Sequence, residues 1–482
     1  MASWTQTRPS SEAYGSPVHS KHSPTRVFTR KLGLNELGFY YDGKINGTAD
    51  SVSHSTLRAA PGIVTLTNVT RVWTMLKHRY PLLGASVYHV DSEPQLRVDE
   101  DRLASLSVGE LTWATVPTKE TANALAASIV HEERKLSDAL LARVEVWTQN
   151  DEPSISHLMI HLAHLITDGV SGTNLLRTFL TFLSSPEDNL NGPIPAIETR
   201  LALAVSAESL TPPARSFSLA RQRWRKAAGK IISKMQDSKR QGGHTLPRAF
   251  GPIAARIPAR SAMRRVQLSP AETSRLLQNC RHCRITVGNA LPVLAQVALA
   301  RVLCRKFLRG EIEAAEWEFR RQQPSHTAGP VNIRPYLDSN WYQAGGKENV
   351  SVYVGYFYLT ASFTPLPRLS LGDRLPEMTE LMSHGRFLLR CNRMKQLATK
   401  YLQHPLFFEI GAARLENKIP IQKEVAQKII SGQKFADPNT LNASPMEQVR
   451  HTGSVFSHAW STFGNVLSFP SAQNSSPDYS IT

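Results

Sequence analysis

The chain has 482 residues, of which 41% are hydrophobic and 20% are charged. This composition excludes a wholly disordered chain, and the length suits two domains or one large double domain. Lys and Arg outnumber Asp and Glu by 56 to 39, a formal charge of +17, which favours an anionic partner such as a nucleic acid, an anionic lipid or a phosphorylated small molecule.

Residues 1–26 are rich in Ser, Pro and Thr and lack the apolar centre of a signal peptide, so we interpret them as a flexible leader. The densest apolar stretch, residues 290–303, is interrupted by Gln296 and is shorter than the roughly 20 residues of a membrane span. We therefore expect a cytoplasmic monomer without a membrane span, and at most weak contact with a membrane.

In chain order, residues 27–98 predict a strand, a helix over residues 67–80 and then a pair of strands. The predicted helix has one apolar face, made by Val69, Val72, Trp73, Leu76 and Tyr80. Pro81 ends it. A further amphipathic helix is expected over residues 119–137.

Residues 154–166 alternate in the manner of a strand. Leu158, Ile160, Leu162 and His164 fall on one face, and His157, Met159, His161 and Ala163 fall on the other. Asp168 and Gly169 break the pattern, and a helix is predicted through residues 175–182. The segment from His164 to Gly169 therefore lies where a strand ends and a helix is about to begin.

Residues 184–214 are rich in Pro and Ser and indicate the start of a crossover. Residues 215–248 then hold ten Lys or Arg and one acid, and Phe217, Trp224 and Ile231 are spaced by seven, which predicts a basic amphipathic helix. This stretch lacks any recognised nucleic-acid-binding signature, so we expect no nucleic-acid partner. Its cations would attract the phosphates of a ligand, contact anionic lipid, or simply face solvent.

A second domain is expected from about residue 256. Ser269, Pro270 and Glu272 form a helix-start signature, Thr286 begins an apolar helix through Leu303, residues 350–363 predict a strand, and residues 373–403 return to helix. The predicted organisation is a leader (1–26), a first domain (27–200), a basic linker (201–255), a second domain (256–470) and a polar tail (471–482). Strands and helices mix throughout, so the fold class is α/β.

The segment from His164 to Gly169 carries the strongest chemical signal. His is the side chain best matched to removing a proton at neutral pH, and a rigid strand end followed by a turn would hold such a base in place. Asp168 would point away from the reaction and pair with an Arg, and Gly169 would allow close packing that a side chain would block.

Alternatives to a catalytic base stay open at this point. His164 would be a structural histidine if its ring were buried and satisfied. In a helix, His161, His164 and Asp168 would share a face like metal ligands, but the alternating pattern argues against a helix, and we expect no metal. Ser171 lacks the spacing of a serine-hydrolase nucleophile.

The cysteines offer little. Cys280 and Cys283 form a C-x-x-C pair with no second pair and no nearby metal-spaced histidines. We interpret them, with Cys304 and Cys391, as reduced thiols.

The segment from His164 to Gly169 resembles the H-x-x-x-D-G motif of the chloramphenicol-acetyltransferase-like superfamily, which includes BAHD acyltransferases, condensation domains of peptide synthetases and fungal O-acetyltransferases. Three further stretches match in order. Residues 76–83 (LKHRYPLL) are similar to the family's "hRHPLL" turn, residues 330–335 (PVNIRP) to its "vNlRpr" segment, and residues 354–356 (VGY) stand at its "GN".

The resemblance implies two α/β sandwich domains with a solvent tunnel between them, and His164 as the general base inside it. It also implies that Asp168 pairs with Arg334 across the domain interface, so that Asp168, Gly169 and Arg334 support the catalytic loop. Two positions depart from the family. Ala163 stands where many members have a second His, and residues 461–465 (STFGN) only partly match the C-terminal D-F-G-W-G motif.

The expected function is therefore transfer of an acyl group, most simply acetyl, from acyl-CoA to a hydroxyl of a secondary-metabolite acceptor, with no permanently bound cofactor. The stand-alone fungal O-acetyltransferases are the members that the chain resembles most. The alternatives are an amide-forming enzyme with the same base, and a catalytically impaired binding protein on the same fold.

Overall fold

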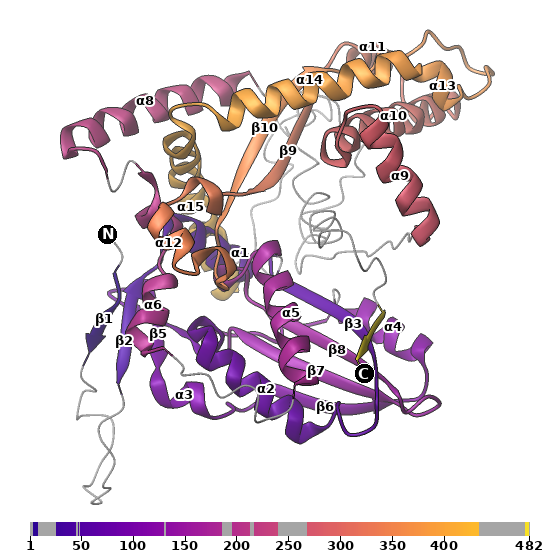
Figure 1. Cartoon of the computed structure of the whole chain (residues 1–482). Coiled ribbons are helices and arrows are strands. Elements are labelled where there is room, and N and C mark those ends of the chain that lie inside the picture. Colours follow the sequence, from indigo (N-terminus) through magenta and orange to yellow (C-terminus); the bar gives the residue numbers. More distant parts are fainter. Residues whose placement is uncertain are drawn as a thin grey trace, which may run out of the picture.

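The computed structural model describes residues 3–7, 26–44, 47, 49–129, 132–185, 195–212, 216–239, 268–432 and 478–481 (Figure 1). Most of the predicted leader and tail, the motif at residues 461–465 and residues 240–248 of the basic stretch lie outside these ranges.

The strands are β1 (Thr5–Thr7), β2 (Val27–Lys31), β3 (Ser51–Ala59), β4 (Ser86–Val90), β5 (Glu93–Asp99), β6 (Leu111–Val116), β7 (Ala142–Gln149), β8 (Ile155–Leu162), β9 (Pro324–Asn332), β10 (Val354–Ser362) and β11 (Asp478–Ile481). The α-helices are α1 (Leu34–Lys44), α2 (Leu66–Arg79), α3 (Glu100–Ala104), α4 (Lys119–Ser128), α5 (Gly169–Ser184), α6 (Ile197–Leu203), α8 (Leu219–Ser238), α9 (Pro270–His282), α10 (Val287–Leu308), α11 (Ala314–Arg321), α12 (Ser339–Gln343), α13 (Met378–Leu381), α14 (His384–Leu402) and α15 (Phe407–Ile430). Short 3-10 helices include η2 (Pro81–Gly84), η4 (His164–Ile166) and η8 (Arg334–Tyr336).

The first half of the chain, joined by β11 from the C-terminal end, builds two sheets around one core. The larger sheet has the order β11-β3-β8-β7-β6, and the smaller has the order β1-β2-β5-β4. Every residue of β8 is buried: β3 and β7 pair with its two edges, and its side chains pack into apolar clusters on both faces of the sheet. Helices α2 and α5 pack against each other and share the large apolar core with Leu158, Ile160 and Leu162 of β8 (Figure 1).

The predicted helix over residues 67–80 is confirmed as α2. Thr65 caps its first turn by accepting a hydrogen bond from the Asn68 N–H, and its apolar face is fully buried. The helix ends at Arg79, Tyr80 is its C-cap, and from Pro81 the chain turns through η2 into β4.

The second half has its own core, in which α9, α10 and α14 pack with β10. The capping box at Ser269 and Glu272 is formed, and Thr286 caps α10, so both predicted helix starts are confirmed. Among the described residues, only α10 is long and apolar enough to cross a membrane by length and composition, and half of its apolar window is buried within the structure.

Two helices at the joint between the halves were not predicted. Helix α1 contains Gly38 and Gly43 and shows no clear apolar face in its sequence, and α15 contains Pro420, which normally breaks a helix. The two helices pack against each other, and α15 also packs against α8 of the basic stretch (Figure 1). The joint is therefore made by helices with weak local signals.

Several predicted boundaries shift. The strand before His164 ends at Leu162, and the helix predicted over residues 119–137 ends at Ser128. After Ser128 the chain leaves the helix, so that Arg134 reaches Asp50 instead of extending a surface helix. The helix predicted over residues 373–403 is two helices, α13 and α14, and the strand predicted from residue 350 begins at Val354. The α/β fold class is confirmed.

Candidate active site

His164 lies two residues after Leu162, the last residue of β8, where the chain enters a tight turn. Ala163 keeps an extended backbone, and its N–H still donates to the Leu141 carbonyl. The Ile166 N–H then donates back to the Ala163 carbonyl, which closes η4 with His164 as its first residue. The main chain at His164 is thus held at the end of the central strand of the larger sheet by hydrogen bonds of the residues around it.

The imidazole ring of His164 lies flat against a phenyl ring of α1. The centroids of the Phe39 and His164 rings are 3.8 Å apart, and their planes differ by 9°. The residue as a whole stays partly exposed, whereas Nδ1 is buried and has no hydrogen-bond partner of normal geometry among the described residues. Phe39 therefore covers one face of the ring and restricts the orientations that the ring can take.

Burial lowers the pKa of His164 from its ordinary value of 6.5. The main chain of His164 itself, then the carboxylates of Asp168, Asp50 and Asp42, act in the opposite direction and favour the charged form. Burial prevails, so the ring is neutral at neutral pH and can accept a proton.

A second carboxylate, that of Asp50 directly before β3, lies near His164 and is paired with Arg134. The Asp50 Oδ2–Arg134 Nε distance is 2.6 Å, and the Oδ1–Nη2 distance is 3.0 Å. Burial raises the pKa of the Asp50 carboxyl, and Arg134 together with His164 opposes that rise. The sequence analysis missed Asp50, since it lies more than 100 residues before the motif and matches no pattern.

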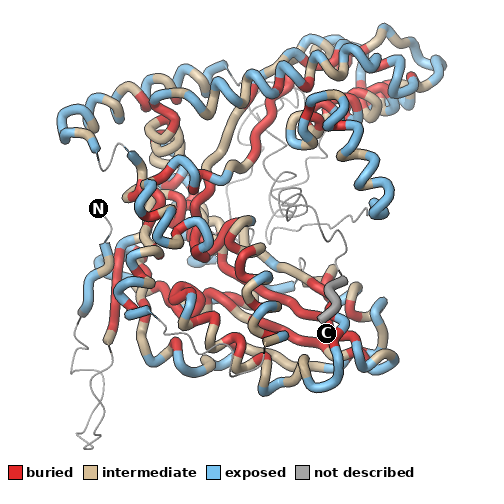
Figure 2. Tube along the Cα trace, in the orientation of Figure 1, coloured by how far each residue is buried: buried red, intermediate tan, exposed pale blue. Residues whose placement is uncertain are grey.

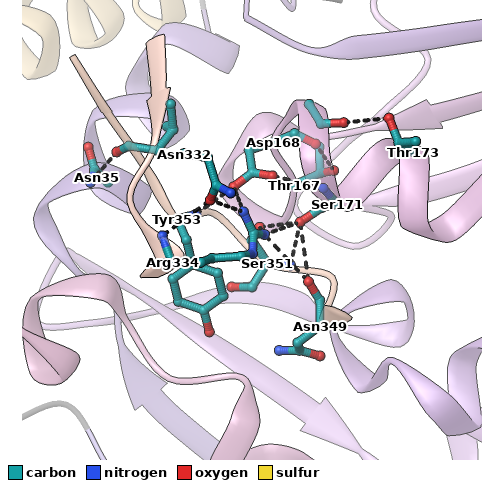
Figure 3. Close-up of polar contacts among 12 residues, drawn as sticks. Asn35, Thr167, Asp168, Ser171, Thr173, Asn332, Arg334, Asn349, Ser351 and Tyr353 are labelled. Carbon is teal, nitrogen blue, oxygen red and sulfur yellow. Dashed lines mark hydrogen bonds and ion pairs between the residues drawn. The ribbon is translucent and has the colours of Figure 1, made fainter. Parts of the chain in front are cut away.

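Asp168 caps α5 and also reaches the second half of the chain (Figure 3). Its Oδ1 accepts a hydrogen bond from the Ser171 N–H at 2.8 Å. Its Oδ2 accepts from Arg334 Nη1 at 2.9 Å and from the Tyr353 N–H at 2.7 Å. The ion pair that the resemblance implied is therefore present, and both side chains are buried.

Arg334 is 1% exposed and binds more than one partner. Its Nη2 donates to Ser171 Oγ at 2.8 Å and to the Ser351 carbonyl at 3.2 Å, and its guanidinium lies 4.9 Å from the centroid of the Tyr353 ring. The charge is thus surrounded by a carboxylate, a hydroxyl, a carbonyl and an aromatic face, which offset the cost of burying it.

Ser171, rejected above as a nucleophile, is an organising residue of this contact. Its buried hydroxyl donates to the Ser351 carbonyl at 2.5 Å and accepts from Arg334 and from the Ser351 N–H at 3.0 Å. These bonds occupy the hydroxyl completely, so it is unavailable to attack a substrate. We name Asp168, Ser171, Arg334, Ser351 and Tyr353 the clasp (Figure 3).

Further polar contacts hold the same joint. The Tyr353 hydroxyl has one proton to donate and lies within hydrogen-bond distance of the carbonyls of Leu203 and Val205, and Asn35 of α1 donates through Nδ2 to the Val354 carbonyl at 3.1 Å. Asn35 and Tyr353 were missed by the sequence analysis, because nothing in a sequence shows which side chains meet main chain from a distant segment.

Gly169 differs from expectation. It is the first residue of α5, it is exposed, and its φ lies outside the left-handed region. The close packing that we expected around it is therefore not seen.

The structure also separates the residues of the metal alternative. His161 points at Glu145, with Nε2 and Oε1 3.0 Å apart, while Asp168 faces Arg334. Among the described residues no group of three or more His, Cys, Asp or Glu side chains is arranged to hold a metal ion, and the four cysteines are free thiols.

No protein-family model and no curated protein matches the sequence. Solved structures do match the fold. The TRI3 trichothecene 15-O-acetyltransferase from Fusarium sporotrichioides superposes with a TM-score of 0.57 over 82% of this chain and 76% of that chain, at 12% identity. The first condensation domain of the calcium-dependent antibiotic synthetase superposes with a TM-score of 0.53 over 81% of this chain and 77% of that chain, also at 12% identity. The α/β fold expected from the resemblance is thus confirmed, since the chain superposes on these two-domain structures over most of its length.

Proposed function

We propose that the chain is an acyl-CoA-dependent acyltransferase in which His164 is the general base. The observation that carries the proposal is an imidazole stacked on Phe39, on a turn whose following acid is tied to Arg334 of the other half of the chain. The fold, shared with an O-acetyltransferase and a condensation domain, supports the same reaction class.

The proposed reaction needs no covalent enzyme intermediate. His164 removes the proton of an acceptor hydroxyl while the oxygen attacks the thioester carbonyl, which gives a tetrahedral intermediate. Collapse of that intermediate breaks the carbon–sulfur bond and expels the CoA thiolate, and the imidazolium returns the proton to the sulfur. The products are the ester and free CoA. Because the Ser171 hydroxyl is fully engaged in the clasp, direct transfer within a ternary complex is the simplest route.

The clasp would act through position. Asp168 and Arg334 do not accept the substrate proton in this scheme; they fix the turn that follows His164 and hold the two halves in one arrangement. Active sites of this kind lose much of their rate when a reacting group is displaced by about 1 Å. Asp168 and Arg334 are therefore positioning residues, and Gly169 only begins the helix that follows the turn.

The acceptor that we propose is a hydroxyl of a secondary metabolite, and the donor is acetyl-CoA, bound from opposite sides of a channel between the two halves. The 15-O-acetyltransferase named above supports the hydroxyl. The condensation domain favours an amine acceptor as the second candidate, since the same base would deprotonate an attacking amine.

The test is release of free CoA thiol by the purified full chain. Acetyl-CoA and longer acyl-CoA thioesters would be offered with hydroxylated terpenoid and polyketide acceptors, and in parallel with their amino analogues. We expect acceptor-dependent thiol release that falls at least about 100-fold in His164→Ala. His54→Ala, which changes a histidine of β3 outside the clasp, is the matched control and should keep the activity.

Two results would contradict the proposal. Acyl transfer that is unchanged in His164→Ala would exclude His164 as the general base. Absence of transfer from every thioester, with a correctly folded protein that still binds CoA, would favour a catalytically impaired binding protein.

A further inference from the structure

Helix α8 has two faces of different character. The side that packs on α15 is formed by Arg225, Gly229 and Ser233. Arg225 pairs with Glu409, and a Cβ added at Gly229 would come within 2.7 Å of the Glu409 Cβ. This close contact fixes which side of α8 faces the protein.

The other side carries large apolar side chains in solvent. Trp224 is 66% exposed, Ile231 is 62% exposed and Met235 is 55% exposed. At 3.6 residues per turn these three residues form one stripe, about 140° around the helix from the face that contacts α15. Figure 2 shows most of α8 as exposed, at the outer edge of the molecule. We name Trp224, Ile231 and Met235 the exposed stripe.

Cations stand on both flanks of the exposed stripe. By helical position, Arg223 and Lys234 lie on one side of it, and Arg221 and Lys239 lie on the other. These four have no ion pair with any described residue, and the one acid within Leu219–Lys239 is Asp237. Other cations of α8 are satisfied within the protein; Lys226, for example, pairs with Glu416 at 2.6 Å.

We propose that this face of α8 binds an anionic lipid surface, with the exposed stripe inserted among the headgroups and the flanking cations on the lipid phosphates. A helix of this pattern lies in the plane of the interface, with its apolar side chains at the boundary of the acyl chains. Long Lys and Arg side chains can keep their charges at the headgroups while their stems stay apolar. Trp is also a side chain favoured at membrane interfaces.

The lipid is favoured over a nucleic acid because of the stripe. Phosphate contacts alone require the cations but gain nothing from an isoleucine and a methionine in solvent. A membrane requires both the apolar stripe and the charges, and both are present on one helix. The inference concerns a surface apart from His164 and does not rest on the proposed acyl transfer.

The experiment is sedimentation of the full chain with large vesicles of phosphatidylcholine, with and without about 30% phosphatidylserine. We expect binding to the anionic vesicles at least about tenfold stronger than to neutral ones. Trp224→Ser with Ile231→Ser and Met235→Ser should weaken the binding at least about tenfold. Val108→Ser with Leu371→Ser is the matched control, since both residues are exposed apolar side chains elsewhere, and it should bind as the wild type does.

The charges are tested separately. Arg221→Gln with Arg223→Gln and Lys234→Gln should remove the preference for anionic vesicles. A 20-base-pair DNA duplex tests the alternative ligand, a nucleic acid, against the anionic vesicles. Wild-type protein that ignores anionic vesicles, stripe variants that bind as well as wild type, or DNA binding that is stronger than lipid binding and insensitive to the stripe would each overturn the proposal.

Discussion

Asp168 Oδ2 and Arg334 Nη1 lie 2.9 Å apart, although the two residues are separated by 166 positions in the chain. Asp168 lies between η4, which follows β8, and helix α5, whereas Arg334 is the first residue of η8, which follows β9. The pair therefore links the turn that carries His164 to the equivalent turn of the second half. Its burial makes this link sensitive to the loss of either partner.

Replacing Arg334 by Ala should destabilise the fold by about 3–5 kcal/mol, because Asp168 would remain charged and buried without a cation. Urea unfolding followed by circular dichroism measures this free energy. Arg374→Ala is the matched control, since the Arg374–Glu380 pair is exposed and its loss should have little effect.

The double variant Asp168→Asn with Arg334→Met separates charge from packing. It removes both charges together, so we expect it to be more stable than Arg334→Ala alone. If Arg334→Ala unfolds at the same urea concentration as the wild type, the clasp does not hold the two halves.

Replacing Ser171 by Ala tests whether this hydroxyl organises the clasp or attacks the substrate. Loss of its bonds to Arg334 and Ser351 should cost about 1–3 kcal/mol of stability, because the partners stay buried. Acyl transfer should persist, and mass spectrometry of the wild type mixed with acyl-CoA should show no acyl adduct on Ser171. A covalent adduct there, lost together with activity in the variant, would reverse the assignment.

Helix ends that are marked by a capping residue or a proline could be predicted from the sequence alone. Pro81, Ser269 and Thr286 mark helix ends by the missing N–H of proline or by capping, and in the structure a helix ends just before Pro81 and helices begin after Ser269 and Thr286. The pairing of Asp168 with Arg334 was expected only from the resemblance, since spacing along the chain does not indicate contacts across a domain joint.

The missed features share one physical reason. Phe39 lies on a helix whose glycines interrupt the apolar periodicity that predicts a helix. The role of Asp50 depends on its tertiary contact with Arg134. Tyr353 acts in the clasp partly through its main-chain N–H, which every residue except proline possesses. A sequence records side-chain types and local periodicity, but these roles depend on tertiary neighbours.

Replacing Phe39 by Ala should raise the pKa of His164. The stacked ring contributes to the burial that lowers this pKa from 6.5, and its removal lets water reach the imidazole. The base works only when neutral, so the acid limb of kcat/KM against pH should move to higher pH. Phe39→Tyr, which keeps a stacked ring, is the control and should leave the limb near its wild-type position.

Replacing Asp50 by Asn should shift the same limb in the opposite direction. The Asp50 carboxylate favours the charged form of His164, so a neutral amide in its place lowers the pKa of His164 further. The acid limb of kcat/KM should then move to lower pH, while Arg134 keeps an oxygen partner in the amide. Two variants with opposite shifts separate an effect on His164 from general damage to the site, which would lower activity at every pH. Shifts in the same direction, or none in either variant, would show that the titrating group is not His164.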